Sequence, residues 1–342
     1  MMPNITSVQE LEEHLSRPTA DDVSAMKALD GDLLILGAGG KMGPSLAMLA
    51  RRAADLAGSR KRVIAVSRFS DEKLRSEFSS QNIEPIACDL LELGVLAKLP
   101  EVANVVFMAA RKFGTSGSEH LTWAMNTFLP GLVAERFRNS RIIAFSTGNV
   151  YPLTPEKDGG AVESTVVEPK GEYAQSALGR ERMFEYGSHR WGTPVTILRL
   201  NYAVELRYGV LADIGLAVFE RRPIDLRMGY VNVIWQRDAN SACLRSFGHC
   251  QSPPLVLNLT GPETLSVRRV AEEFGQRFGV DPIFEFEESP TALLSNAGQA
   301  QRVFGCPSIT AAVIIEWLAD WISNRRPMLN KPTHFHARDG KF

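Results

Sequence analysis

The chain has 342 residues, of which 44% are hydrophobic and 23% charged, a composition and length that predict a globular protein of two lobes. Its formal net charge of -1 at pH 7 lacks the basic footprint of a nucleic-acid binder, so we expect a small-molecule partner and no nucleic acid. There is no run of eighteen apolar residues, no secretory leader pattern and no C-x-x-C pair, which predicts a cytoplasmic protein without a membrane span, a metal site or disulfides.

Residues 1–30 have the pattern of two short helices that precede the first strand. Ser7 and Glu10 predict a capping box at the first helix, and Thr19 and Asp22 predict a weaker one at the second. We expect this N-terminal helical extension to pack against the main domain, with a role in oligomerisation as an alternative.

From residue 31 to about 200, short apolar runs alternate with helical patterns. The apolar runs are, in order, DLLIL, RVIAVS, IEPIAC, NVVFMAA, RIIAFS and PVTILRL. Helical patterns stand near 43–57, 71–80 and 119–138 and after Tyr173. Strands that are apolar throughout and separated by helices predict a parallel sheet covered on both faces. We therefore predict a doubly wound α/β domain of the Rossmann type over 31–200.

After residue 200 the alternation loosens. We predict a smaller lobe over 201–330 that is mainly substrate-binding, with some segments returning to the Rossmann sheet and with helices near 266–279 and 310–324. The polar tail 331–342 contains His334 and His336, an H-x-H pair that suits a metal. We expect a disordered tail instead, because no third ligand is near in sequence.

A glycine-rich loop directly follows the first predicted strand. Gly37, Gly40 and Gly43 have G-x-x-G-x-x-G spacing, and a helix follows them. Glycine lets the backbone turn tightly and approach a pyrophosphate, whose charge the helix N-terminus stabilises. At the first strand-to-helix junction of an α/β chain, this loop predicts a dinucleotide site that includes Lys41 and Met42.

The end of the second predicted strand bears on the choice of cofactor. In NAD binders an acidic residue usually stands there and hydrogen-bonds the adenosine ribose, whereas this chain has Ser67 and Arg68. Because an arginine can pair with a 2′-phosphate in bidentate fashion, we predict NADP. NAD is the alternative if a shifted strand end brings Asp71 or Glu72 to the ribose.

The glycine loop, the strand order and Tyr173 together resemble the extended short-chain dehydrogenase/reductases, the NAD(P)-dependent sugar epimerase/dehydratase family. The resemblance runs from about Asp32 to about Ile322. Further similar stretches are ACDLLEL with Asp89 and Leu90, FMAARKFG with Ala109 and Ala110, AMNTFLPG with Asn126, FSTGNVYP with Thr147 and Asn149, and LRLNYAV with Asn201. The resemblance implies cofactor contacts for Asp89, Leu90, Ala109, Ala110 and Tyr173, and substrate contacts for Thr147, Asn149 and Asn201.

In this family a tyrosine takes a proton from a sugar hydroxyl while hydride passes to the nicotinamide, and a Ser/Thr hydroxyl orients the same oxygen. Tyr173 and Thr147 match those two positions. The family's lysine, four residues after the tyrosine, is replaced here by Ala177. Because a phenol titrates near ~10 and one opposite charge shifts a pKa by about 1–3 units, its loss leaves about ten to a thousandfold less phenolate.

Another cation is therefore expected to serve Tyr173. Lys112 follows the alanine-rich strand end and is the predicted replacement, since a compact, flexible ammonium copies lysine well. Arg180, seven residues after Tyr173 on the same helical face, and Arg111 are the alternatives. A different base, Tyr202 or Glu205, is a further alternative.

The resemblance also limits the reaction. Sugar 4,6-dehydratases follow the catalytic Thr with Asp-Glu, whereas Thr147 is followed by Gly148 and Asn149, so water elimination is disfavoured. We expect an oxidoreductase or epimerase that acts by hydride transfer on a hydroxyl of a sugar, nucleotide sugar or sugar acid, with Arg222 of the second lobe binding substrate phosphate. A non-catalytic NAD(P)-binding sensor or scaffold is the alternative that Ala177 favours. The resemblance further suggests a homodimer through the helices near 119–138 and 173–190.

Overall fold

The protein is represented by a computed structural model that describes residues 5–112, 114 and 117–341. The main sheet in this described part has seven strands in the order β12-β7-β5-β4-β1-β2-β3. These strands are β1 (Leu33–Leu36), β2 (Val63–Ser67), β3 (Glu84–Ala87), β4 (Asn104–Phe107), β5 (Arg141–Thr147), β7 (Val195–Leu200) and β12 (Leu255–Leu259). All neighbours pair in parallel. The predicted doubly wound parallel sheet is therefore confirmed.

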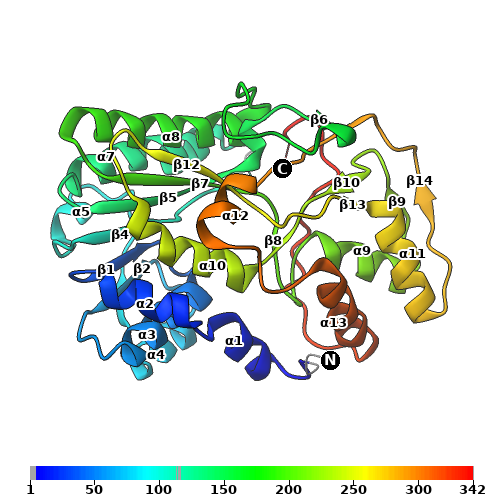
Figure 1. The fold of residues 1–342 in the computed structure, drawn as a ribbon, viewed down its shortest axis with the longest axis horizontal. Helices are drawn as coiled ribbons and strands as arrows, with labels where there is room; N and C mark the ends of the chain where they lie inside the picture. Colours follow the sequence, from blue (N-terminus) through cyan, green and yellow to red (C-terminus); the bar gives the residue numbers. More distant parts are fainter. Residues whose placement is uncertain (1–4, 113, 115–116, 342) are drawn as a thin grey trace.

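Helices cover both faces of this sheet (Figure 1). Their bounds are α3 (Gly43–Leu56), α4 (Glu72–Ser80), α5 (Val95–Lys98), α6 (Glu119–Trp123), α7 (Leu129–Arg136), α8 (Gly171–Trp191) and α10 (Gln236–Arg245). Alternate residues of β1 point to opposite faces, as the pleat of a strand requires. Leu33 and Ile35 pack in a core with α3 and α10, whereas Leu34 and Leu36 pack in a core with α5, α7 and α8.

The long helix expected near 119–138 contains a π-helical turn. Helices α6 and α7 are joined through residues Ala124–Phe128, which form that turn. Asn126 lies in it and is fully buried. Single π turns inside helices are frequent at functional sites, and this one places the Asn126 amide beside the candidate site described below.

The second lobe combines helices with short paired strands. It contains β8 (Ala203–Val204), α9 (Val210–Phe219), β9 (Ile224–Asp225), β10 (Tyr230–Val231), β11 (Ile234–Trp235), β13 (Leu265–Ser266), α11 (Val267–Phe278), β14 (Phe284–Glu285) and α13 (Ala311–Ser323). Shorter elements are β6 (Thr154–Pro155), β15 (Thr291–Ala292), α12 (Gly298–Phe304) and 3-10 turns at Gly148–Val150, Glu156–Asp158 and Ser246–His249. A core of its own forms where α9, α11 and α13 meet. β12, although late in the chain, pairs with β7 at the edge of the main sheet.

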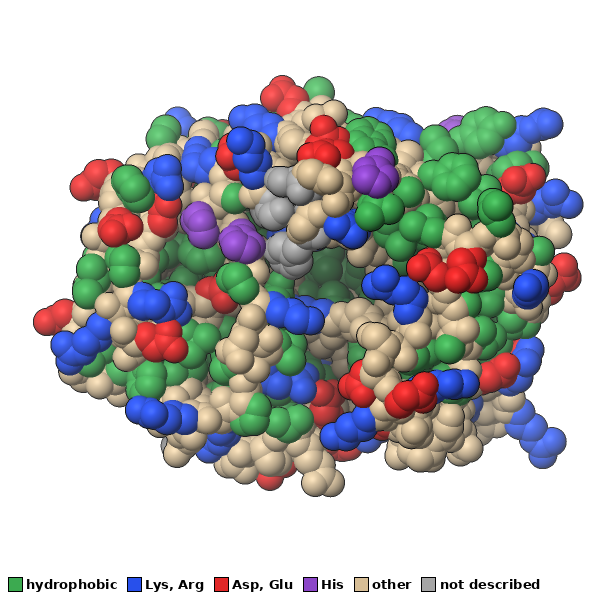
Figure 2. All heavy atoms as spheres, turned by 180° about the vertical axis from the view of Figure 1, so that it is seen from behind, with side chains coloured by type: hydrophobic (Ala, Val, Ile, Leu, Met, Phe, Trp, Pro, Cys, Tyr) green, Lys and Arg blue, Asp and Glu red, His purple; other side chains and the backbone are tan. Residues whose placement is uncertain are grey.

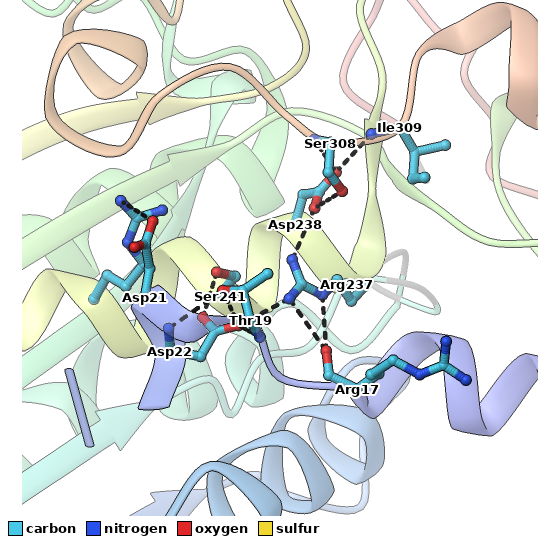
Figure 3. A network of polar contacts seen from close by, with 10 residues as sticks. Arg17, Thr19, Asp21, Asp22, Arg237, Asp238, Ser241, Ser308 and Ile309 are labelled. Atoms are coloured by element: carbon cyan, nitrogen blue, oxygen red, sulfur yellow. Dashed lines mark hydrogen bonds and ion pairs between the residues drawn. The ribbon is translucent and has the colours of Figure 1, made fainter. Parts of the chain in front are cut away.

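The N-terminal helices α1 (Val8–Ser16) and α2 (Ala20–Ala28) pack on α3 and α10. The capping box of α2, which was expected to be the weaker of the two, is complete. The side chain of Thr19 accepts from the backbone N–H of Asp22, and the side chain of Asp22 accepts from the backbone N–H of Thr19. Figure 3 shows Asp22 facing α10, where its carboxylate accepts from Ser241 and, at 2.8 Å, from Nη2 of Arg237. Arg237 also donates to the backbone carbonyl of Arg17 at 3.1 Å. The extension is thus fixed to the main body by buried polar contacts.

Replacing Asp22 with Ala should destabilise the fold by about 3–5 kcal/mol, because Asp22 is fully buried and Arg237 would keep only one of its two charged partners, Asp238. The neighbouring Asp21→Ala is a matched control. The Asp21 side chain is 67% exposed and pairs with Arg245 at 3.3 Å, so its loss should cost about 0–1 kcal/mol. Urea unfolding of the two variants measures both values, and equal effects would contradict the prediction.

The C-terminal tail differs from the disordered segment expected. Phe335 is 7% exposed and belongs to the core of the second lobe, and Thr333 is also buried. His334 and His336 lie with their ring centroids 6.1 Å apart. No group of three or more His, Cys, Asp or Glu side chains within the described residues is placed to hold a metal ion. No helix in that same part of the chain has the length and apolar character needed to cross a membrane.

Candidate active site

The glycine loop between β1 and α3 is shaped by close backbone contacts. Gly37 has a φ of +96°, and a Cβ added there would lie 2.6 Å from the backbone nitrogen of Ala109. A Cβ on Gly43 would lie 2.3 Å from the carbonyl oxygen of Ala38. Only glycine fits these two positions without rearrangement. Helix α3 begins after Met42 without a side-chain cap, so its first N–H groups remain available to an anion.

One cavity, of about 240 Å³, opens on the side of the loop that faces β2 and β3. Its lining includes Gly37, Gly40, Ser67, Arg68, Asp71, Asp89, Leu90, Ala109 and Ala110. β2 ends at Ser67, as predicted, so Arg68 and not an acidic residue follows the strand. The carboxylate of Asp71 caps α4 by accepting from the backbone N–H of Lys73 at 2.9 Å. This cavity contains the residues that the sequence analysis expects at the adenosine end of a dinucleotide.

A second cavity, of about 280 Å³, shares Gly37, Gly40 and Ala110 with the first. Its lining also includes Lys41, Met42, Lys112, Thr147, Asn149, Tyr173, Arg180, Asn201, Tyr202, Tyr208 and Thr333. We refer to it as the catalytic cavity, after the role that the sequence analysis expects for Tyr173 and Thr147. Figure 2 shows a face of the molecule that is hollowed near its centre, with Lys and Arg side chains around the hollow. The two cavities meet at the glycine loop, as a bound dinucleotide would require.

Tyr173 and Thr147 reach the catalytic cavity from different elements. Tyr173 lies in the first turn of α8 and is 8% exposed, and Thr147 is the last residue of β5. Oγ1 of Thr147 accepts hydrogen bonds from the backbone N–H of Asn149 at 3.2 Å and from its Nδ2 at 2.9 Å. Asn149 therefore fixes the orientation of the Thr147 hydroxyl.

Ala177 is fully buried, and the cation nearest to it along the helix is Arg180. Nη1 of Arg180 donates to the carbonyl of Phe145 at 2.8 Å, and Nη2 donates to Oδ1 of Asn126 at 2.9 Å. Among the described residues, its buried Nε has no hydrogen-bond partner. Burial lowers the pKa of Arg180, and attraction to Tyr173 and Glu181 opposes this. A rigid positive charge therefore lies within electrostatic reach of Tyr173.

Asn126 connects this guanidinium to the loop that carries Lys112. Its Oδ1 also accepts from the backbone N–H of Arg111 at 2.9 Å, and its Nδ2 donates to the Arg111 carbonyl at 2.9 Å. The same Nδ2 donates to Oγ of Ser176 at 3.0 Å. The π turn thus connects the loop after β4, which carries Lys112, to α8, which carries Tyr173.

Two lysines enter the catalytic cavity. Nζ of Lys112 lies 5.8 Å from the ring centroid of Tyr173, and burial lowers the pKa of Lys112 to about 8. Nζ of Lys41 donates to the carbonyl of Ala203 at 2.8 Å and lies 3.4 Å from the ring centroid of Tyr208. Burial lowers the pKa of Lys41 to about 7. Lys41 therefore bridges the glycine loop and the second lobe, a contact that the motif did not reveal.

A buried ionic network joins the strand that ends at Thr147 to the helix that carries Tyr173. Nη2 of Arg199 on β7 pairs with Glu181 of α8 at 2.7 Å, and Ser146, beside Thr147, donates to Glu181 at 2.5 Å. Nη1 of Arg199 donates to the hydroxyl of Tyr151 at 2.7 Å, which in turn donates to Asn258 at 2.8 Å. These contacts hold β5, β7 and α8 together, and Ser146 also lines the catalytic cavity.

The remaining predicted residues are not all in this cavity. Asn201 lines it and bonds the Leu259 carbonyl through its backbone N–H at 2.9 Å. Arg222 lines a different cavity and donates to Glu220 at 2.6 Å. Glu205 is 1% exposed and pairs with Arg207, so it is poorly placed as a base. Tyr202 lines the catalytic cavity with a φ of +48°, and burial raises its pKa, which disfavours its phenolate.

No family sequence model matches the chain, and no curated protein matches it in sequence. Many solved structures share its fold. A UDP-glucuronic acid 4-epimerase from Bacillus cereus, in complex with UDP-4-deoxy-4-fluoro-glucuronic acid and NAD, is 16% identical and superposes with a TM-score of 0.72 over 86% of this chain and 99% of that chain. A dTDP-glucose 4,6-dehydratase from Streptomyces venezuelae with NAD bound is 16% identical, with a TM-score of 0.70 over 86% and 98% of the two chains. A UDP-glucose 4-epimerase from Thermotoga maritima with UDP-glucose is 14% identical, with a TM-score of 0.67 over 86% and 99%.

These likenesses confirm the resemblance to the extended short-chain dehydrogenase/reductases at the level of the fold. The parallel sheet, its covering helices and the smaller lobe are shared with enzymes that bind NAD and nucleotide sugars. Because a fold hosts many functions, the chemistry has to be argued from the residues of the site.

Proposed function

We propose that the protein is an NAD(P)-dependent oxidoreductase or epimerase that acts by hydride transfer on a hydroxyl of a sugar, nucleotide sugar or sugar acid. The observation that carries the proposal is that Tyr173 and Thr147 line one cavity, which meets a second, adenosine-sized cavity at an uncapped glycine loop. When bound, the nicotinamide supplies hydride acceptance and return. The chain supplies orientation, proton transfer and exclusion of water.

Tyr173 is proposed as the acid/base that exchanges the proton of the substrate hydroxyl. Thr147, held by Asn149, donates to the same oxygen and fixes its direction. Asn201 lies beside Gly148, where a Cβ on the glycine would be 3.3 Å from the Asn201 side chain, and is proposed to contact the substrate. Neither Gly148 nor Asn149 can shuttle a second proton, which argues against water elimination.

Two cations are proposed to replace the lysine that Ala177 lacks. Arg180 is the fixed one, because two hydrogen bonds hold it and a guanidinium stays charged at every working pH. Lys112 is the second, because its Nζ lies 5.8 Å from the ring centroid of Tyr173 and burial lowers its pKa to about 8. Together they would stabilise the negative charge that develops on the Tyr173 oxygen while the proton is transferred.

The proposed cofactor is NADP, with NAD as the alternative. Lys41, Met42 and the loop glycines would hold the pyrophosphate, and Arg68 would pair with the 2′-phosphate. Arg68→Ala should weaken NADP binding by about ten to a hundredfold and leave NAD binding unchanged, since a charge-assisted bond contributes roughly 1.5–3 kcal/mol. Calorimetric titration with each dinucleotide measures this. A preference for NAD in the unmodified protein would contradict the NADP assignment.

We also propose a homodimer through α6, α7 and α8. An apolar groove between them is lined by Trp123, Phe128, Leu132 and Met183, and Phe128 is 59% exposed. Exposed aromatic side chains of this kind mark association surfaces. Sedimentation velocity should give a dimer for the intact chain and a monomer for Phe128→Glu, whereas a monomeric intact chain would contradict the proposal.

A panel of sugars, sugar acids and nucleotide sugars tests the catalytic proposal. The protein loaded with oxidised dinucleotide is mixed with each compound, and absorbance of the reduced nicotinamide is recorded together with the products. Reduction, or epimerised product without net reduction, is expected with at least one member. The alternative, a non-catalytic NAD(P)-binding sensor or scaffold, is favoured by Ala177 and predicts tight dinucleotide binding with no hydride transfer to any member.

A further inference from the structure

The C-terminal segment 331–341 crosses the second lobe and ends beside α8, the helix that carries Tyr173. Figure 1 shows it in red, running from the end of α13 back toward the middle of the molecule. Nη1 of Arg338 donates to the backbone carbonyls of Arg227 and Thr291 at 2.8 and 2.6 Å. Beyond it, a Cβ on Gly171 would lie 2.3 Å from the Gly340 carbonyl oxygen. The segment therefore packs against the backbone two residues before Tyr173.

Helix α9 borders two cavities along a single face. Val210 lines the catalytic cavity, and Asp213, Ile214 and Ala217 line another cavity of about 230 Å³. Residues spaced by three and four positions stand in one row on a helix, so the two cavities follow each other along the same wall. The opposite wall of the 230 Å³ cavity is made partly by Pro332, His334, Phe335 and His336 of the C-terminal segment.

Thr333 stands between the two cavities. Its backbone N–H and its hydroxyl donate to Oδ2 of Asp213 at 2.8 and 2.6 Å. Thr333 itself lines the catalytic cavity, while the residues on both sides of it line the other. The segment thus divides what would be one groove along α9, and it separates Arg222 from Tyr173.

The catalytic cavity that remains is small. Its 280 Å³ lies below the range of about 300–1,000 Å³ found for pockets that hold drug-sized ligands. Part of that volume lies against Gly37, Gly40 and Ala110, on the dinucleotide side. The space left for a substrate suits a small molecule, and Thr333 lies between this space and the cavity that Arg222 lines.

We propose that the C-terminal segment determines substrate specificity by excluding nucleotide-linked sugars, so that the substrate is a compact sugar or sugar acid. This inference rests on the proposed function, because it names the substrate class of the Tyr173 site. A nucleoside diphosphate attached to the sugar would need the groove along α9 that Thr333 and its neighbours occupy.

Binding of UDP-glucuronic acid, measured by calorimetry with dinucleotide present, tests the proposal. The forms compared are the intact chain, the double variant Thr333→Gly/Arg338→Ala, and a chain ending at Lys331. The exposed Lys341→Ala in the same segment is the matched control. Thermal unfolding of each form shows whether it is folded. If the shortened chain does not fold because it lacks the buried Phe335, the double variant decides.

The intact chain and Lys341→Ala should bind UDP-glucuronic acid weakly, and the opened forms should bind it at least about tenfold more tightly, because the groove is no longer occupied. Tight binding of UDP-glucuronic acid by the intact chain would overturn the proposal. So would folded, opened forms that bind no better than the intact chain. The readout is binding and not turnover, so a failure of hydride transfer, which concerns the proposed function, is recognised separately by the substrate panel.

Discussion

Replacing Tyr173 with Phe is expected to lower the rate of hydride transfer by about 10²–10⁴-fold, because the substrate hydroxyl loses its acid/base. The substitution removes one oxygen atom and keeps the ring that packs at the start of α8. Dinucleotide affinity should therefore change little. Single-turnover reduction of the bound dinucleotide, with any substrate that the panel identifies, measures the loss directly.

Tyr202→Phe is the matched control for this experiment. Tyr202 lines the same cavity, and burial raises its pKa, so it is a poor source of phenolate. We expect its removal to leave the rate within about threefold, a change of well under 1 kcal/mol in the barrier. A full rate in Tyr173→Phe, together with a large loss in Tyr202→Phe, would transfer the role of base to Tyr202.

Replacing Arg180 with Met is expected to lower the rate at neutral pH by about ten to a thousandfold, the effect of removing one charge near the phenol. The rate should recover partly at higher pH, because the phenolate then forms without help. Lys112→Met should cost less above pH 8 than at neutral pH, because burial lowers the pKa of Lys112 to about 8 and the ammonium is increasingly neutral above it. A pH profile of the single-turnover rate separates these effects from a general loss of structure.

Arg182→Met provides a control on the same helix. Arg182 is 52% exposed and pairs with Glu185 at 2.6 Å, away from the cavity. Its removal should alter neither the rate nor its pH profile. Arg180→Met also leaves the Phe145 carbonyl and Asn126 Oδ1 without this donor, so dinucleotide binding should be measured to verify the fold. An unchanged pH profile in Arg180→Met would remove Arg180 from the mechanism.

The fold was predictable because its signals are local. β1 is apolar along its whole length and β4 is apolar after Asn104, since both faces of the sheet are covered, and this pattern is visible in the sequence. The spacing from Gly37 to Gly43 likewise reflects close backbone contacts at one strand-to-helix junction. Most of the residues that strand ends and the glycine loop predict as cofactor contacts therefore line one of the two cavities.

The rest of the site depends on contacts between distant parts of the chain. The hydrogen bond from Lys41 to the Ala203 carbonyl spans 162 positions, and the bond from Thr333 to Asp213 spans 120. Nothing in the local pattern of a polar tail shows that Phe335 enters a core. Arg180 was an alternative from helical spacing, but its anchoring to Asn126 depends on a π turn that breaks the expected regular helix.

The position of Ala177 allows the most direct test of the proposal that another cation beside Tyr173 replaces the missing lysine. The double variant Arg180→Met/Ala177→Lys places a lysine four residues after Tyr173 and removes the guanidinium whose charge would oppose it. Its single-turnover rate at neutral pH should exceed that of Arg180→Met by at least about tenfold, the effect of one restored charge. A full rate in Arg180→Met alone, or a folded double variant that is no faster than Arg180→Met, would contradict a relocated cation.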